Sequence, residues 1–92
     1  MAIVTLRYWA AAKEAARIAE ETVSAGTLAE ALAAARGKTD GSGEAGQDSR
    51  LRAVLARSSF LIDGTPVGSR APEAVVLSDA AVIEVLPPFA GG

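Results

Sequence analysis

The sequence closes with PPFAGG at positions 87–92, where its residue types point to chemistry. Glycine has no Cβ, so Gly91 and Gly92 fit a narrow channel and adopt backbone angles that other residues cannot. Pro87 and Pro88 lack an amide hydrogen and have a fixed φ, which stops strand pairing and holds the following residues extended. The group available for reaction would be the carboxylate of Gly92, which is a poor acyl donor in its unactivated form.

The rest of the chain offers few reactive groups. It contains no Cys and no His, which excludes disulfides, thiolate nucleophiles, zinc sites built on those ligands and imidazole acid–base catalysis. The acidic residues show no spacing typical of paired carboxylates in a cleft, and the serines have no partner base. We therefore expect no enzymatic activity from the chain on its own, no metal site and no permanently bound cofactor.

The composition is that of an ordinary globular domain. Of the 92 residues, 50% are hydrophobic, and the formal net charge is −2. An acidic balance without a Lys/Arg cluster argues against nucleic acid and anionic membrane as partners. The N-terminal residues lack the order of a signal peptide, and no apolar run approaches the length of a membrane span. The cytoplasm is the expected location.

The clearest elements are a strand near the start and a helix after it. Residues 3–9 alternate as a strand, with one set of side chains on each face: Val4, Leu6 and Tyr8 on one, Thr5, Arg7 and Trp9 on the other. Residues 27–36 predict a helix, because Thr27 and Glu30 form a capping box. Its core-facing stripe consists of Leu28, Ala31, Leu32 and Ala35.

The remaining segments alternate between strands, a helix and a loop. Asp63-Gly64 is a two-residue hairpin signal, because both positions tolerate positive φ. Residues 37–48 lack large apolar side chains and predict a flexible surface loop. The other expectations are a turn of helix or structured loop at 10–21, a short strand at 21–26, a helical stripe at 50–58, strands at 60–62 and 65–67, a short strand at 71–79, and a last strand before Pro87 carrying Ile83 and Val85.

This order of elements predicts an α+β fold of the β-grasp (ubiquitin-like) type, a mixed sheet packed against one main helix. Residues 1–86 would form the β-grasp domain, with the glycine-rich loop inserted at 37–48. Residues 87–92 would form an extended C-terminal tail.

The sequence resembles the MoaD/ThiS family of ubiquitin-like sulfur carriers, and most closely its MoaD branch, the small subunits of molybdopterin synthase. The similarity covers nearly the whole length. RYWAAAKEA resembles the end of the family's first strand, FLIDGTPV its central strand and turn, and SDAAVIEVLPPFAGG its closing segment. The Pro-Pro-x-x-Gly-Gly ending is the most specific of these. The chain departs from the family pattern at Ala80 and Ala81, which follow Asp79 where the family commonly has Gly-Asp, and in the length of loop 37–48.

The resemblance implies a route for the chemistry of Gly92. An E1-like adenylating enzyme would join the Gly92 carboxylate to AMP from ATP, and sulfur would displace AMP to leave a thiocarboxylate. The large subunit of molybdopterin synthase would then take the tail into its active site, where a pterin receives the sulfur during molybdenum cofactor biosynthesis. Gly91 would share the channel, and the partner would be contacted through Trp9, Leu86, Pro87, Pro88, Phe89 and Ala90.

Other functions remain open on the sequence alone. A carrier for thiamine or cysteine synthesis would use the same chemistry, although such carriers usually lack the Pro-Pro pair. A ubiquitin-like modifier joined to target lysines would also need a free Gly-Gly end. A non-covalent β-grasp binding module would not.

The alternation of side chains along the first and last strands predicts which residues surround the root of the tail, the point where the last strand passes into residues 87–92. In a β-grasp sheet the first and last strands are parallel neighbours, about 4.8 Å apart. If Tyr8 faces the helix, Arg7 and Trp9 face the opposite way, with Arg7 near Glu84 and Trp9 near Leu86. We expect an exposed Arg7–Glu84 ion pair and an apolar patch of Trp9, Leu86 and Phe89. The alternatives are that Trp9 belongs to the core and that Phe89 folds back into it.

Overall fold

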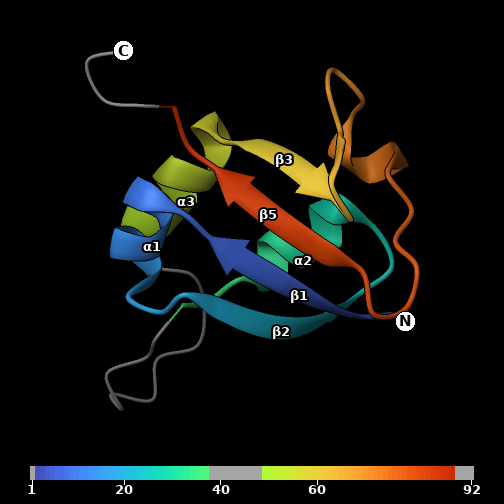
Figure 1. Cartoon of the computed structure of the whole chain (residues 1–92), viewed down its shortest axis with the longest axis horizontal. Helices are drawn as coiled ribbons and strands as arrows, with labels where there is room; N and C mark the ends of the chain where they lie inside the picture. Colours follow the sequence, from blue (N-terminus) through green and yellow to red (C-terminus); the bar gives the residue numbers. More distant parts are fainter. Residues whose placement is uncertain (1, 38–48, 89–92) are drawn as a thin grey trace.

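The chain folds around a mixed β-sheet whose central strands include its first and its last (Figure 1). The computed structural model describes residues 2–37 and 49–88. The elements are β1 (Ala2–Tyr8), α1 (Ala10–Ala16), β2 (Glu20–Ala25), α2 (Leu28–Ala34), α3 (Ser49–Arg57), β3 (Ser59–Ile62), β4 (Thr65–Pro66), a 3-10 helix (Pro72–Ala74) and β5 (Val82–Leu86).

The five strands lie in the order β2-β1-β5-β3-β4. β1 is parallel to β5 and antiparallel to β2, while β3 is antiparallel to both β5 and β4. The parallel pair aligns Leu6 with Ile83 and Arg7 with Glu84. The predicted α+β, β-grasp arrangement is confirmed, including the parallel pairing of the first and last strands.

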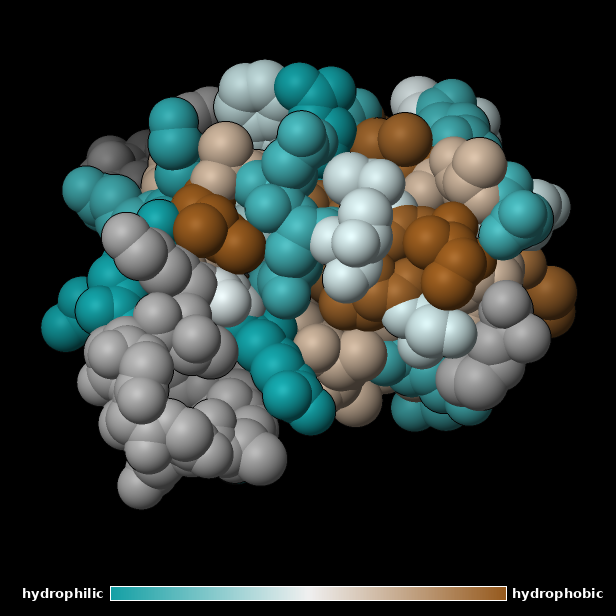
Figure 2. Space-filling view, turned by 90° about the horizontal axis from the view of Figure 1, so that it is seen from below, coloured by the Kyte–Doolittle hydropathy of each residue, from teal (hydrophilic) through white to brown (hydrophobic). Residues whose placement is uncertain are grey.

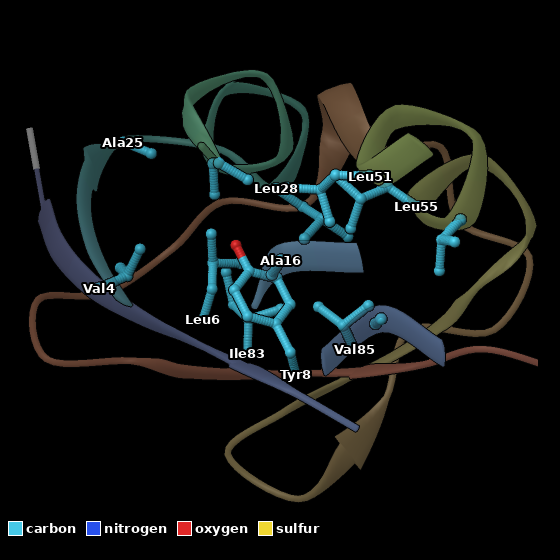
Figure 3. Close-up of a cluster of buried hydrophobic side chains, with 14 of the residues drawn as sticks. Val4, Leu6, Tyr8, Ala16, Ala25, Leu28, Leu51, Leu55, Ile83 and Val85 are labelled. Carbon is cyan, nitrogen blue, oxygen red and sulfur yellow. The ribbon is translucent and has the colours of Figure 1, made fainter. Parts of the chain in front are cut away.

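The core lies between one face of this sheet and the helices (Figure 3). The side chains predicted for the helix-facing side are all buried: Val4, Leu6, Tyr8, Ile83 and Val85. They pack with Leu28 of α2 and with Leu51 and Leu55 of α3. Alternation along each strand therefore separates a packed face from an open one, and the predicted parity of both strands is confirmed.

The α2 helix begins with the predicted capping box. The Thr27 hydroxyl accepts from the Glu30 N–H at 3.2 Å, and the Glu30 carboxylate accepts from the Thr27 N–H at 3.0 Å. These bonds satisfy two amide donors that a helix start leaves without partners. Leu28 and Ala31 of the predicted stripe are fully buried.

The α1 helix is more regular than the sequence indicated, since residues 10–21 predicted only a turn of helix or a structured loop. Its buried side chains are all alanines, at positions 12, 15 and 16. Such a stripe shows no contrast in size with its Ala-rich surroundings, so periodicity does not reveal it. The helix ends at Arg17, which adopts a left-handed conformation with φ of 63°. The helical stripe predicted at 50–58 forms α3 and buries Leu51, Val54 and Leu55.

The β3–β4 hairpin turns at Asp63 and Gly64, with φ values of 50° and 84°, as the sequence predicted. The short strand predicted at 71–79 is wrong. Pro72 instead starts a 3-10 helix, a position that suits its fixed φ, and the following chain makes a single bridge between Val76 and Thr27.

Candidate functional site

The candidate site lies at the end of the sheet where the parallel strands β1 and β5 finish side by side (Figure 1). Tyr8 pairs with Val85, and the next backbone amide, that of Trp9, donates to the Val85 carbonyl at 3.3 Å. The two strands therefore keep their register up to the point where β5 passes into the tail. This fixes the root of the tail beside Trp9.

Trp9 lies on the surface, with 43% of its area exposed. Its carbonyl accepts from the amides of Ala12 and Lys13, which anchors its backbone at the start of α1. The Arg7 guanidinium carbon lies 5.3 Å from the centroid of the indole ring, a cation–π distance. The alternative that Trp9 belongs to the core is therefore wrong, and the predicted outward face of β1 is confirmed.

The start of the tail is partly packed. Leu86 is half-buried, Pro87 is buried and Pro88 is exposed. Residues 87 and 88 belong to no strand, in keeping with the missing amide hydrogens of proline. The chain is therefore packed against the domain through Pro87. The site residues Phe89, Ala90, Gly91 and Gly92 lie outside the described residues, as does the predicted loop except for Gly37.

The structure corrects the ion pair predicted at the tail root. Arg7 does lie opposite Glu84 in the register, but its guanidinium pairs with Glu20 of β2, with 4.0 Å between Nε and Oε2. From a strand between β2 and β5, the Arg7 side chain can reach either neighbour, and it turns toward β2 while lying over Trp9. Both side chains are about half exposed, so the pair contributes on the order of 0–1 kcal/mol.

A hollow of about 210 Å³ opens beside Trp9. It is lined by Arg7, Tyr8, Trp9, Lys13, Ala19 and Glu20. Lys13 and Glu20 were not expected here, because they come from α1 and β2 and no sequence spacing connects them to Trp9. An aromatic ring next to cationic side chains suits a partner that presents apolar and acidic groups together.

Tyr8, which precedes Trp9 and points into the core, is held by a hydrogen-bond network. Tyr8 is only 2% exposed, and its hydroxyl donates to the Glu21 carboxylate at 2.5 Å. The same carboxylate accepts from the amides of Arg36 and Gly37, at 3.1 and 2.7 Å for Oε2. Burial raises the pKa of Tyr8 far above its usual value, and the hydrogen bond and the charge of Glu21 add to the shift. This network links the end of β1 to β2 and to the residues that follow α2.

Two kinds of feature are absent from the described part of the chain. Within residues 2–37 and 49–88, no group of three or more Asp or Glu side chains is placed to hold a metal ion. No helix in those ranges is long and apolar enough to cross a membrane.

Comparison with known proteins finds similarity at the level of structure. No family model and no curated protein matches the sequence. The fold is similar to that of small archaeal modifier protein 1 from Methanosarcina acetivorans, with a TM-score of 0.63, 24% identity, and coverage of 100% of this chain and 98% of that one.

Two other solved structures are similar. A chain of the complex of subunits 1 and 2 of molybdopterin-converting factor from Helicobacter pylori has a TM-score of 0.62 and 21% identity, over 98% of this chain and 99% of that one. The HVO 2177 protein of Haloferax volcanii has a TM-score of 0.70 and 21% identity, over 99% of this chain and 87% of that one. At these identities the likeness establishes the fold alone, and the chain has the β-grasp (ubiquitin-like) fold.

Proposed function

We propose that this chain is a sulfur carrier whose active group is the carboxylate of Gly92. An E1-like enzyme transfers AMP from ATP to that carboxylate and releases pyrophosphate. Sulfur at the sulfide level (HS⁻) then attacks the acyl carbon, the C–O bond to AMP breaks as the C–S bond forms, AMP leaves, and the acyl group becomes a thiocarboxylate. The carrier contributes the acyl group and its presentation, and the activating enzyme contributes ATP and catalysis.

The observation that carries this proposal is the exit of the chain from the sheet. β5 lies between β1 and β3 and ends beside Trp9. The sequence that follows is Pro87-Pro88 and then four residues ending in Gly-Gly. Two prolines stop strand pairing after β5, and glycines without Cβ atoms fit a narrow active-site channel. The arrangement suits a group presented to another protein's active site.

For the destination of the sulfur, we propose the pterin precursor of the molybdenum cofactor. In this role the chain acts as the small subunit of molybdopterin synthase, and the large subunit receives the tail. The Pro-Pro-x-x-Gly-Gly ending supports this choice, as does the structural similarity to a chain of the H. pylori molybdopterin-converting factor complex.

The large subunit would bind the open face of the sheet at the root of the tail. Trp9 is exposed there beside the half-buried Leu86, and Pro88 is exposed where the tail leaves the domain. We propose that these residues, with Pro87, Phe89 and Ala90, form the contact that aims Gly91 and Gly92. Exposed aromatic anchors often dominate the energy of an interface.

A second candidate is a protein modifier that is joined through Gly92 to lysines of other proteins. The similarity to small archaeal modifier protein 1, which extends over the whole chain, favours it. Both functions begin with adenylation and diverge afterwards: a modifier forms an isopeptide bond, whereas a carrier delivers sulfur. A carrier for thiamine or cysteine synthesis differs in the acceptor.

Mass spectrometry of the reconstituted reaction tests the carrier function. The intact chain is incubated with its activating enzyme, ATP and a sulfur source. We expect a mass increase of one oxygen-to-sulfur exchange, localised to Gly92, followed by sulfur transfer to the pterin when the large subunit is added. A chain with one residue added after Gly92 keeps the fold and serves as the matched control.

The outcomes separate the candidates. If the extended chain supports pterin sulfuration without being processed, the carrier proposal is wrong. Conjugates on lysines without pterin sulfuration assign the chain to the modifier class instead. Sulfur gain without transfer to the pterin retains the carrier chemistry but contradicts the molybdopterin destination.

A further inference from the structure

The β2 strand leaves one edge of the sheet open. The hydrogen bond from the Tyr8 N–H to the Ala19 carbonyl determines which residues of β2 direct their backbone groups toward β1. The backbone groups of Glu21, Val23 and Ala25 therefore face β1, and those of Glu20, Thr22 and Ser24 face outward. Among the described residues, these six outward N–H and C=O groups have no hydrogen-bond partner.

The open stretch has definite limits. Beyond Ala25 the edge is covered by the segment 75–77, because the Leu77 N–H donates to the Gly26 carbonyl and the Leu28 N–H donates to the Val75 carbonyl, both at 2.9 Å. Before Glu20 the chain bends at 17–19. The edge thus offers three outward residues and ends on both sides. Figure 2 views the molecule from the side of β2 and shows polar and apolar surface together there.

The two edges of the sheet differ in their protection. β4, at the other edge, has two residues, and one of them is Pro66. Short strands and proline are the usual devices that prevent edge-to-edge pairing. β2 has six residues without proline, lysine or a positive φ. Its charged residues are Glu20, which pairs with Arg7 on the open face, and Glu21, which turns inward to Tyr8. An edge with so little protection is a template for another strand.

We propose that this edge pairs with β2 of a second copy of the chain, antiparallel about a two-fold axis at Thr22. Thr22 then lies opposite its own equivalent, and Glu20 lies opposite Ser24 of the second copy. This register satisfies all six outward backbone groups of each copy, because the open stretch is symmetric about its middle residue. The pairing fits the available length without reaching the segment 75–77.

The neighbouring registers are poorer. A shift of two residues one way sets Glu20 against Gly26 of the second copy, whose carbonyl already accepts from Leu77. The opposite shift sets Glu21 directly against its equivalent, and like charges in opposing positions are unfavourable. In the register about Thr22, no like charges face each other. Glu21 lies opposite Val23, with its carboxylate turned inward to Tyr8 and Gly37.

The pairing leaves the root of the tail free. β1 separates β2 from β5, so the second copy does not reach the end of β5. Glu20 belongs to both surfaces, because it lies in the paired edge and also lines the hollow beside Trp9. The contact is a single short strand on each side, below the size of a standard interface. We therefore expect a weak dimer with a dissociation constant of roughly millimolar to high micromolar.

Disulfide trapping tests the pairing, because the chain has no cysteine of its own. In Thr22→Cys, the two sulfurs of a dimer lie on opposing residues about 5.5 Å apart at Cα, inside the range for a disulfide. Thr65→Cys, an exposed threonine on the opposite edge, is the matched control. At equal protein concentration under mild oxidation, we expect Thr22→Cys to form covalent dimer at least about tenfold faster.

A backbone variant checks that the hydrogen bonds cause the effect. Ser24→Pro in the Thr22→Cys chain removes an outward N–H that makes no bond within the monomer, so the β1–β2 pairing survives. We expect its cross-linking rate to fall to that of Thr65→Cys, while Ser24→Ala leaves the rate unchanged. Melting curves confirm that each variant is folded. Equal rates for Thr22→Cys and Thr65→Cys, or a rate unaffected by a folded Ser24→Pro, would overturn the proposal.

Wild-type protein supplies a measurement that needs no variant. On concentration into the millimolar range, we expect the amide resonances of residues 20–24 to shift, while those of β4 stay fixed. Amide shifts confined to other strands, or a monomeric mass at every concentration, would contradict pairing through β2.

Discussion

Tyr8 and Trp9 are adjacent aromatic residues that the fold treats in opposite ways. Tyr8 is almost fully buried and held by a hydrogen bond to Glu21, whereas Trp9 is nearly half exposed and contacts Arg7 over its ring. The difference arises from strand alternation, which sends one ring to the helices and the next to the open face. Two neighbouring residues at the end of one strand therefore belong to different surfaces, one packed in the core and one open to solvent.

The largest effect is expected from Tyr8→Ala. Removing a fully buried ring leaves a cavity and an unsatisfied network, so the free energy of unfolding should fall by roughly 3–5 kcal/mol. Chemical denaturation monitored by circular dichroism measures the change. A loss no larger than that of Trp9→Ala would remove the distinction between the two faces.

Gly37→Ala should have the next largest effect. Gly37 has φ of 68°, and a Cβ at this position would lie 2.6 Å from the Ala16 carbonyl oxygen. The strain should cost roughly 1–3 kcal/mol of stability. Gly68→Ala is the matched control, because its φ of 66° carries the same backbone penalty with nothing within 4 Å. If both variants lose equal stability, the contact with Ala16 is unimportant.

Alkaline pH should lower the free energy of unfolding that Tyr8 contributes. An unfolded tyrosine titrates near pH 10, whereas burial and then Glu21 hold the pKa of Tyr8 above that value in the folded chain. The stability from this shift is complete below about pH 10 and declines above it, by up to about 1.4 kcal/mol per pH unit. Tyr8→Phe cannot show this decline, so the stability difference between wild type and Tyr8→Phe should shrink as pH rises. A constant difference from about pH 9 to 11 would contradict the account.

The smallest effect is expected from Glu20→Gln on the open face. The Arg7–Glu20 pair is exposed and long, so its loss should change stability by about 0–1 kcal/mol. Thermal melting at low and at high salt measures it. A larger loss of stability would mean that side chains on the open face also stabilise the fold.

The parts of the structure that the sequence predicted well depend on local signals. Alternation in β1 and β5, the Asp63-Gly64 turn and the Thr27–Glu30 capping box each act within a few residues, and each is confirmed. The β-grasp order follows from the sequence of these elements.

The features that sequence reasoning missed depend on tertiary contacts. The alanine face of α1 becomes visible only once it packs on the sheet, and the choice of Glu20 over Glu84 by Arg7 depends on side-chain reach across strands. The segment after Pro72 has strand-like residues but finds only a single bridge at Val76. Pro87 is buried, although it follows the last strand and the sequence placed it in the extended tail.

The measurement that tests the central claim most directly is a calorimetric titration of Trp9→Ala with the large subunit of molybdopterin synthase, paired with a thermal melt. We expect at least about tenfold weaker binding, consistent with loss of an interface anchor worth roughly 2 kcal/mol or more. We also expect a stability loss below the roughly 3–5 kcal/mol of a buried aromatic. Val76→Ala, an exposed apolar residue away from the tail root, should change neither. Unchanged affinity, or a stability loss as large as that of Tyr8→Ala, would contradict the assignment of the open face to recognition.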